Sequence, residues 1–277
     1  MSSLISLTGN AKELDRKHSQ LQETLHTMGS VLVAFSGGAD SALLLKVAHD
    51  VLGDRAIGAI AVSETIPSDE VAQAESLARD IGVELRTVYT EEMLNASFRA
   101  NAPDRCYHCK DELFTKLSPL AEELGSRWLA FGANMDDLGD YRPGQQAAKE
   151  WGVRAPLQEA ELSKQEIRAL SRKLGLRTWN KPAMACLSSR IPHGTAIDVE
   201  AIRRVEAAEQ CLRQEGFGQL RVRAHDQIAR LEVPVDDLAR LLEPALRARV
   251  TARLHEIGYR YITLDLDGFR SGSMNPV

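Results

Sequence analysis

The chain has 277 residues, of which 44% are hydrophobic and 26% charged, and its formal net charge at pH 7 is −5. These values are ordinary for soluble globular proteins and exclude a disordered or fibrous chain. The longest run of apolar residues and glycine, Ala56 to Val62, is far shorter than the ~20 residues that cross a bilayer. The first residues do not have the pattern of a secretory signal. We therefore expect a cytoplasmic protein of one or two domains.

The first half of the chain alternates between predicted strands and predicted helices. An amphipathic helix over residues 11–28 precedes an apolar strand, SVLVAF, and a helix that ends at Gly53. A second strand, AIGAIAVS, is followed by a helix with a serine cap that ends at Gly82, and by a third strand, VELRTVYT. A short helix from Glu91, a helix over residues 111–124 and a fourth strand, WLAFGAN, complete the pattern. This alternation predicts an α/β fold in which helices cover both faces of a parallel sheet.

The second half of the chain is less regular. Residues 136–156 are rich in turn-forming and polar residues and are predicted as a loop. A capped helix, SKQEIRALSRKLGL, and an irregular segment over residues 180–195 follow. We then expect a helix over 198–215, a hairpin of strands 219–224 and 227–232, two helices and a last strand over 259–264. We place a domain boundary after residue 194, between an α/β nucleotide-binding domain (1–194) and a smaller α+β domain (195–277).

The motif Ser36-Gly37-Gly38-Ala39-Asp40-Ser41 lies between the first predicted strand and the helix that follows it. Its two glycines let the backbone turn tightly and present N–H groups to an anion. The helix N-terminus adds its dipole, and the two serines add hydroxyl groups. The lysine of a P-loop NTPase is absent, so γ-phosphate transfer of that kind is not expected. An ordinary strand–helix turn is the alternative, but this structural context favours a phosphate site.

The loop resembles the SGGxDS signature of the pyrophosphatase-loop (PP-loop) ATP enzymes, which adenylate a carboxyl or carbonyl oxygen and release pyrophosphate. Further segments resemble the LarE-type sulfur transferases over nearly the whole chain: ANMDDLGDYRPG, NKPAMACLSSRIPHGT, RVRAHDQIARLE and LDLDGFRSGSMN. The resemblance implies that the enzyme uses ATP and Mg²⁺ to thiolate pyridinium-3,5-biscarboxylic acid mononucleotide, in the synthesis of the nickel-pincer cofactor of lactate racemase. It also implies five ATP-binding residues: Ser36, Gly37, Gly38, Asp40 and Ser41.

Cysteines supply a candidate metal site. Cys106 and Cys109 have the CxxC spacing of metal ligands, and Cys186 lies in the irregular segment. Redox chemistry is one alternative, and a structural zinc with His108 as fourth ligand is another, although a histidine inside a CxxC points awkwardly for the same ion. Three thiolates suit a [4Fe–4S] cluster with one open iron that can hold an extra sulfide. Cys211 lies within a helical pattern, and we predict that it is a core residue.

The resemblance bears on the cysteines as well. Some LarE-type members sacrifice one cysteine, which becomes dehydroalanine, whereas others use three cysteines and a cluster. The sacrificial cysteine falls at the position of Ala185, one residue before Cys186. The resemblance therefore implies the three-cysteine subtype, with Cys106, Cys109 and Cys186 as cluster ligands and Cys186 also as a catalytic residue.

The resemblance gives roles to further residues. Lys110 alone would be interpreted as a solvated lysine at a helix start, but the resemblance implies a catalytic lysine that acts on the adenylate. Arg221 and Arg223 alternate along one predicted strand and share a face, with Glu232 on the partner strand. The resemblance implies that the two arginines clamp the phosphate of the substrate and that Glu232 is a catalytic residue that orients it. Half-exposed sheet charges are the alternative.

Ser189 and Arg190, which follow Cys186, are candidates for binding the carboxylate or phosphate of the substrate. As partners we expect a small-molecule mononucleotide, a homo-oligomer and other enzymes of nickel-pincer cofactor biosynthesis, with no nucleic acid and no membrane. A tRNA-thiolating PP-loop enzyme remains an alternative, but it would need a basic face, and the region after residue 191 is nearly charge-balanced. A non-catalytic nucleotide-binding protein with a structural zinc is a second alternative, and it would release no pyrophosphate.

Overall fold

The structure is a computed structural model that describes residues 2–139, 142–182, 185–270 and 273–274, with only the backbone of residues 2–10. Packing divides the chain into two compact units. The first comprises Met1–Ser63, Ser68–Glu91 and Cys106–Met184, and the second comprises Glu64–Pro67, Glu92–Arg105 and Ala185–Val277. Two short pieces from the first half of the chain thus pack with its C-terminal part. The division into separately folding domains after residue 194 stays a prediction.

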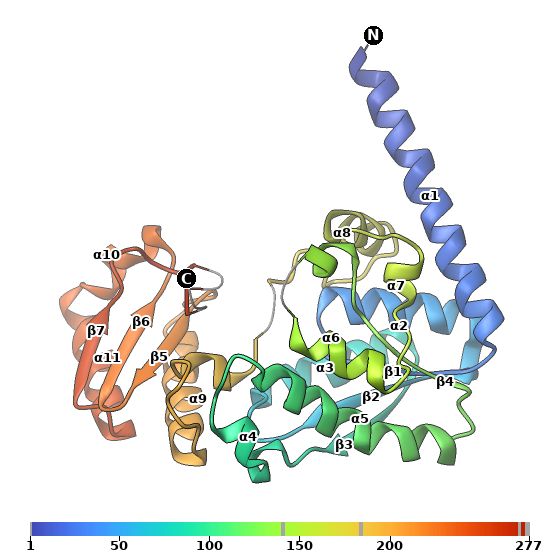
Figure 1. Cartoon of the computed structure of the whole chain (residues 1–277). Helices are drawn as coiled ribbons and strands as arrows, with labels where there is room; N and C mark the ends of the chain where they lie inside the picture. Colours follow the sequence, from blue (N-terminus) through green and yellow to red (C-terminus); the bar gives the residue numbers. More distant parts are fainter. Residues whose placement is uncertain (1, 140–141, 183–184, 271–272, 275–277) are drawn as a thin grey trace. The chain divides into compact units, whose positions relative to one another are not determined.

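A four-stranded parallel sheet forms the centre of the first unit (Figure 1). Its strands are β1 (Val31–Ala34), β2 (Ala56–Val62), β3 (Glu84–Tyr89) and β4 (Trp128–Phe131), in the order β3-β2-β1-β4. All three strand pairs are parallel. The predicted α/β fold and the four predicted strands are therefore confirmed.

Helices surround this sheet. They are α1 (Ser2–Met28), α2 (Ala39–Leu52), α3 (Ser68–Ile81), α5 (Arg105–Glu123), α6 (Pro143–Glu150), α7 (Pro156–Glu159) and α8 (Lys164–Lys173), with 3-10 turns at Gly53–Arg55 and Met135–Gly139. Among the described residues, no helix has the length and hydropathy of a membrane span.

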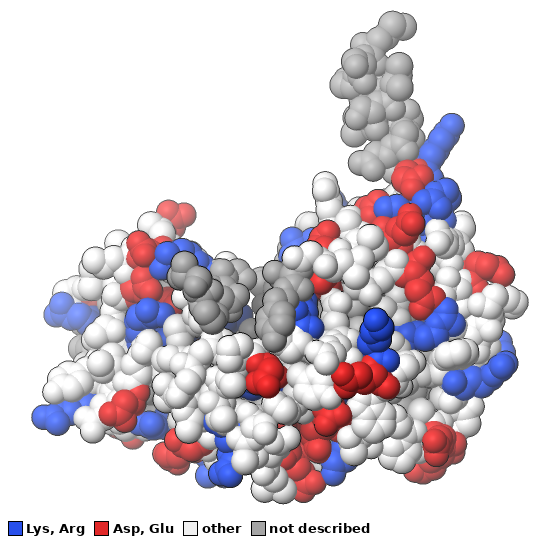
Figure 2. Space-filling view, in the orientation of Figure 1, with Lys and Arg blue, Asp and Glu red and all other residues white. Residues whose placement is uncertain are grey.

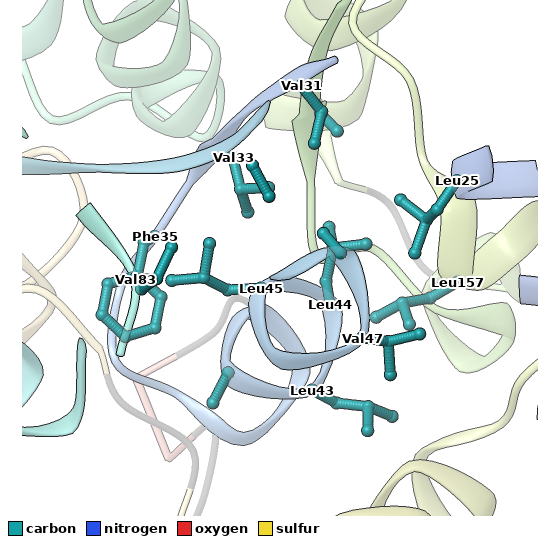
Figure 3. Close-up of a cluster of buried hydrophobic side chains, with 14 of the residues drawn as sticks. Leu25, Val31, Val33, Phe35, Leu43, Leu44, Leu45, Val47, Val83 and Leu157 are labelled. Carbon is teal, nitrogen blue, oxygen red and sulfur yellow. The ribbon is translucent and has the colours of Figure 1, made fainter. Parts of the chain in front are cut away.

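Successive residues of β1 supply two separate cores, because strand side chains alternate between the faces of a sheet. Val31 and Val33 pack with residues of α1, α2, α3, α7 and α8 on one face. Figure 3 shows this cluster around the leucines of α2. Leu32 packs with residues of α5 and α6 on the other face, among them Phe114 and Ala147. Burial on both faces explains why β1 is continuously apolar.

The second unit contains a three-stranded sheet with strand order β5-β6-β7. The predicted hairpin is confirmed: β5 (Arg221–His225) pairs antiparallel with β6 (Ile228–Glu232), and Asp226 at the turn has φ of 55°. β7 (Tyr261–Leu264) runs parallel to β6 after the connecting helices α10 (Leu238–Leu241) and α11 (Pro244–Ile257). The unit also holds α4 (Ala96–Arg99), α9 (Val199–Gln214) and 3-10 turns at Glu92–Leu94, Leu187–Arg190 and Val235–Asp237.

Several predicted boundaries were wrong. Helix α5 begins at Arg105 rather than at residue 111, and α6 lies inside the region predicted as a loop. Two hydrogen bonds connect α5 with the C-terminal end of α6. Tyr107 Oη of α5 donates to Glu150 at 2.6 Å, and Trp151 Nε1, just after α6, donates to Asp111 of α5 at 2.8 Å. These contacts are tertiary, and a search for apolar periodicity does not detect them.

Candidate active site

The SGGADS loop lies at the carboxyl end of β1, the position where the strand order changes direction. β2 and β3 lie on one side of β1, and β4 lies on the other. In open α/β sheets, ligands bind outside the carboxyl ends of the strands at this switch point. The sheet topology therefore places the predicted phosphate loop where a nucleotide site is expected.

Hydrogen bonds between its own residues shape the loop. Ser41 Oγ lies 3.1 Å from Ser36 Oγ, accepts from the Ser36 N–H at 3.2 Å and donates to the Gly38 carbonyl at 3.3 Å. Gly38 is the N-cap residue of α2 and supplies no side-chain cap. The first N–H groups of α2 thus keep their capacity to bind an anion. The structure brings together all five predicted loop residues, which are Ser36, Gly37, Gly38, Asp40 and Ser41.

Two glycines are required for the close packing of this loop. Gly37 has φ of 71°, and a Cβ atom there would lie 2.7 Å from Cβ of Ala74 in α3. Gly132 follows β4, and a Cβ atom there would lie 2.7 Å from the Ser41 nitrogen. Real Cβ contacts are longer than this, so a side chain at either position would move the loop. Gly132 was not among the predicted site residues, because nothing in its local sequence marks the approach.

Two lysines that the sequence analysis missed contact the loop. Lys164 Nζ, at the start of α8, lies 2.5 Å from Asp40 Oδ2. Lys181 Nζ lies 2.7 Å from Glu70 Oε2 and 3.4 Å from the Gly37 carbonyl oxygen. Ser163 and Glu166 form a capping box that fixes the start of α8, and Lys164 is the first residue of this helix. The sequence therefore placed Lys164 at a helix start, but it did not show that this helix start lies beside the loop. Two ammonium groups therefore lie at a loop that lacks its own lysine.

The Asp40 carboxylate is suited to a divalent cation. Its Oδ1 atom is buried and has no hydrogen-bond partner within the described residues. A buried carboxylate oxygen without a partner is costly, and an oxygen ligand of this kind is what Mg²⁺ prefers. The donor at this position therefore fits a magnesium ion bound together with nucleotide phosphates.

Cys106, Cys109 and Lys110 share one face of helix α5, because their spacings are three and four residues. Cys106 is exposed, and Cys109 and Lys110 are half-buried. Gly144 of α6 allows this arrangement, since a Cβ atom there would lie 2.9 Å from Cγ of Lys110. The first turn of a helix favours the thiolate form of cysteine. This helix turn therefore offers two thiols and an amine on one face.

His108 does not share that face. It is two residues from Cys106, and residues at this spacing point to different sides of a helix. This geometry opposes a zinc site in which His108 and Cys106 bind the same ion. Within the described part of the chain, no three His, Cys, Asp or Glu side chains are grouped to hold a metal ion. Cys106 and Cys109 belong to the first unit and Cys186 to the second, so the three-cysteine set stays a prediction.

Arg190 lies within the second unit, where 2% of the residue is exposed. Its Nε and Nη2 atoms donate to the two carboxylate oxygens of Glu209 at 2.8 and 3.0 Å. Its Nη1 atom donates to the carbonyl oxygens of Ala185 and Cys186 at 2.6 and 2.9 Å. Ser189 Oγ also donates to the Cys186 carbonyl, at 2.8 Å. These bonds hold the backbone around Cys186, and the predicted binding of substrate by Ser189 and Arg190 remains untested.

Glu209 of α9 is fully buried and accepts further hydrogen bonds from Arg213 Nη2 at 3.0 Å and the Val222 N–H at 3.1 Å. Burial alone would raise the pKa of the Glu209 carboxyl, but the hydrogen bonds and charge of Arg190, with Arg221 and Val222, bring that pKa below its ordinary value. Glu209 is therefore ionised and fixes the segment that carries Cys186.

The Arg223–Glu232 pair is also buried, with 5% of Arg223 and none of Glu232 exposed. Arg223 Nη2 donates to Glu232 Oε2 at 2.8 Å, and Nη1 donates to the Ser189 carbonyl at 2.9 Å. The alternative of half-exposed sheet charges is therefore wrong for this pair. The structure brings together Ser189, Arg223 and Glu232, three of the predicted residues.

Arg221 lies opposite Glu232 in the hairpin and on the same face as Arg223. Its guanidinium carbon lies 5.3 Å from the ring centre of Phe269. Burial, with a smaller effect from the charge of Arg190, lowers the pKa of the Arg221 guanidinium to about 10. Arg221 thus keeps its charge at neutral pH, as a phosphate ligand must.

Cys211 is buried in α9, so its predicted core position is confirmed.

Comparison with known proteins identifies the family. A family model described as NAD synthase matches residues 13–115. The pyridinium-3,5-bisthiocarboxylic acid mononucleotide synthase of Lactiplantibacillus plantarum is 41% identical over 263 residues, which cover 95% of each chain. The chain belongs to the LarE-type sulfur transferase family of PP-loop enzymes. An uncharacterised protein of Synechocystis is 44% identical over 264 residues, or 95% of this chain and 98% of the relative.

A more distant relative extends the comparison. An uncharacterised protein of Methanocaldococcus jannaschii is 25% identical over 260 residues, or 94% of this chain and 98% of the relative. These relatives span both units, so the likeness is not confined to the ATP loop. Membership of a LarE-type family favours an ATP-using enzyme over the non-catalytic alternative.

The tRNA-thiolating alternative would need a basic face. On the face shown in Figure 2, lysines and arginines are interspersed with acidic residues.

Proposed function

We propose that this LarE-type enzyme uses ATP to adenylate and thiolate the carboxylates of pyridinium-3,5-biscarboxylic acid mononucleotide. The observation that carries the proposal is the complete SGGADS loop at the switch point of a parallel sheet, in a chain that matches a pyridinium-3,5-bisthiocarboxylic acid mononucleotide synthase over 95% of its length. The bisthiocarboxylic acid for which that relative is named differs from the proposed substrate by the exchange of carboxylate oxygen for sulfur.

The loop residues bind ATP for the first step. The N–H groups at the start of α2, with Ser36 and Ser41, hold the phosphates, and Asp40 would hold the Mg²⁺ ion that offsets their charge. A substrate carboxylate oxygen attacks the α-phosphorus, and the bond to the bridging oxygen breaks. Pyrophosphate leaves with that electron pair, and the substrate becomes an acyl-adenylate.

We infer that Lys164 and Lys181 replace the missing loop lysine. Both ammonium groups already lie within hydrogen-bond range of loop residues Asp40 and Gly37. The β- and γ-phosphates of ATP carry the charge that develops on the leaving pyrophosphate, and fixed cations stabilise it. Lys110 is proposed to act at the α-phosphate or the acyl-adenylate.

In the second step a sulfur nucleophile attacks the activated carbonyl carbon. The bond from that carbon to the AMP oxygen breaks, AMP leaves, and a thiocarboxylate remains. A [4Fe–4S] cluster on Cys106, Cys109 and Cys186 would supply the sulfide. Two of the proposed ligands are supported by geometry, since α5 presents the thiols of Cys106 and Cys109 from one face. Arg221 and Arg223 are proposed to hold the substrate phosphate, with Ser189 and Glu232 beside them.

The test of this function is product analysis with a matched pair of variants. The wild-type enzyme should form AMP and pyrophosphate only when the mononucleotide is present, and mass spectrometry should find sulfur in place of carboxylate oxygen. Asp40→Asn should abolish AMP formation. Asp50→Asn is the control, because Asp50 lies near the other end of the same helix and forms an ion pair with Lys46 at 2.5 Å. Formation of ADP and inorganic phosphate would refute the proposed chemistry.

The cluster is tested by anaerobic purification followed by analysis of iron, sulfide and zinc. Alanine in place of Cys106, Cys109 or Cys186 should remove the brown chromophore and the activity together. Cys211→Ala should remove neither, because Cys211 is a buried core residue. Loss of H₂S from Cys186 after reaction, in a protein without iron, would contradict the cluster and support single-use chemistry.

A further inference from the structure

Residues 265–270, which follow β7, lie at the open end of the β5–β6 hairpin. Beyond β7, the Asp265 N–H donates to the Leu231 carbonyl at 2.9 Å, and the Phe269 N–H donates to the Val233 carbonyl at 2.8 Å. Gly268 makes the turn possible: its φ is 71°, and a Cβ atom there would lie 2.9 Å from the Val233 oxygen. Backbone hydrogen bonds therefore anchor this segment along the last residues of β6.

Three residues after β7 contact the three arginines on one face of the hairpin. The contacts are Phe269 with Arg221 (5.3 Å to the ring centre), Ser273 Oγ with Arg223 Nη2 (2.9 Å) and Met274 Sδ with Arg230 Nη2 (3.3 Å). Two of these arginines are the proposed phosphate ligands. Phe269, Ser273 and Met274 thus lie beside the proposed phosphate ligands of the second unit.

Ser273 connects the two members of the buried ion pair. Its hydroxyl accepts from Arg223 Nη2 and donates to Glu232 Oε1 at 3.0 Å. Arg223 can only donate, and an ionised Glu232 can only accept, so the group between them has to do both. A hydroxyl meets this requirement, whereas a phosphate oxygen without a proton would face the Glu232 carboxylate unfavourably. Ser273 is therefore a bridge and not a stand-in for the substrate phosphate.

The hydrogen bonds of Arg223 named above use three of its five N–H donors. Its Nη1 atom is held by the Ser189 carbonyl, and its Nη2 atom is held by Glu232 and Ser273. Its Nε atom is buried and has no hydrogen-bond partner within the described residues. An unsatisfied buried donor on a cation is costly, and an oxygen of a phosphate monoester is the acceptor that suits it.

We propose that Ser273 is a positioning residue for substrate binding, and that it acts by fixing the Arg223 guanidinium against Glu232. A guanidinium that is fixed before the substrate arrives loses less conformational entropy on binding. Ser273 is then a part of the proposed substrate site. This inference rests on the proposed function, since the ligand of Arg223 is taken to be the phosphate of the mononucleotide.

The test compares Ser273→Ala with Ser273→Thr in the full-length enzyme. Ser273→Ala should raise the KM for pyridinium-3,5-biscarboxylic acid mononucleotide about threefold to tenfold, the effect of one hydrogen bond, and leave kcat and the affinity for ATP unchanged. Ser273→Thr keeps the hydroxyl and should restore the wild-type KM. Thr263→Ala is the control, because its hydroxyl contacts the Ala229 carbonyl on the neighbouring strand.

The outcomes separate the inference from the function on which it rests. If the wild-type enzyme binds and thiolates the mononucleotide and Ser273→Ala has the wild-type KM, the role of Ser273 is refuted and the proposed function stands. Equal KM values for the alanine and threonine variants, both above wild type, would also refute the bridging hydroxyl. A wild-type enzyme that does not bind the mononucleotide would overturn both proposals. A lower melting temperature without a change in KM would show a structural role alone.

Discussion

Replacement of Arg190 by methionine should destabilise the second unit and change how its stability depends on pH. Methionine keeps much of the length of the side chain but removes the charge and every hydrogen bond that Arg190 donates. Glu209 would then remain fully buried, with hydrogen bonds from Arg213 Nη2 and the Val222 N–H. Removal of one partner from a buried ion pair costs about 3–5 kcal/mol of unfolding free energy.

The pH dependence follows from the direction of the Glu209 pKa. In the wild-type protein this pKa lies below its ordinary value of 4.5, so the ionised carboxylate stabilises the fold above that value and this contribution is lost as pH falls through the folded-state pKa. In Arg190→Met burial remains and the main partner is gone, so the pKa of Glu209 should rise above 4.5. The variant then loses stability as pH rises through the raised pKa. The difference from wild type should therefore be largest at about pH 7–8 and smallest below about pH 4.

Urea denaturation followed by two signals can assign the effect to the second unit. The three tryptophans, Trp128, Trp151 and Trp179, all lie in the first unit, so their fluorescence reports its unfolding, whereas circular dichroism reports both units. The fluorescence transition should be unchanged, and the dichroism midpoint should fall. The double variant Arg190→Met with Glu209→Met should recover much of the loss, because no buried charge remains unpaired. A single variant with wild-type stability at neutral pH would refute the reasoning.

Three further predictions concern the ligand sites. Gly37→Ala should abolish ATP binding in calorimetry while the protein stays folded, because its Cβ atom would lie 2.7 Å from a side chain of α3 in a backbone with φ of 71°; retained ATP affinity would refute the close approach. Lys164→Met should weaken the binding of ATP and pyrophosphate about tenfold to a hundredfold and leave AMP binding unchanged. Lys173→Met is the control on the same helix; Lys173 pairs with Asp15 at 2.7 Å, and its replacement should leave the binding of all three ligands unchanged. Arg223→Met should weaken mononucleotide binding by a similar factor and leave ATP binding intact, and equal weakening of both would show that the phosphate site is misplaced.

The sequence by itself determined the α/β fold and the position of the ATP loop. The apolar strands, the glycine pair and the helix that follows are local features, and their order along the chain is enough to predict a parallel sheet with the loop at a strand end. The shared face of Arg221 and Arg223 on β5 was also predicted from spacing, since residues two apart on a strand share a face. The roles proposed for these arginines and for the cysteines came from the family resemblance. The start of α5 was not predictable in this way, because its first turns, with Cys106 and Lys110, lack an apolar period.

The tertiary structure decided which charged side chains lie beside these motifs. Lys164 and Lys181 are more than a hundred residues from the loop in sequence, and no local pattern connects them to it; the packing of α8 and of the segment after it against the loop does. The same is true of Glu209, Glu232 and Ser273, whose burial depends on neighbours from distant parts of the chain. A charge is held inside a protein only where a partner and hydrogen bonds offset its lost hydration. Those partners are brought together by the complete fold, and so the sequence supplied the reacting groups while the tertiary structure supplied their environment.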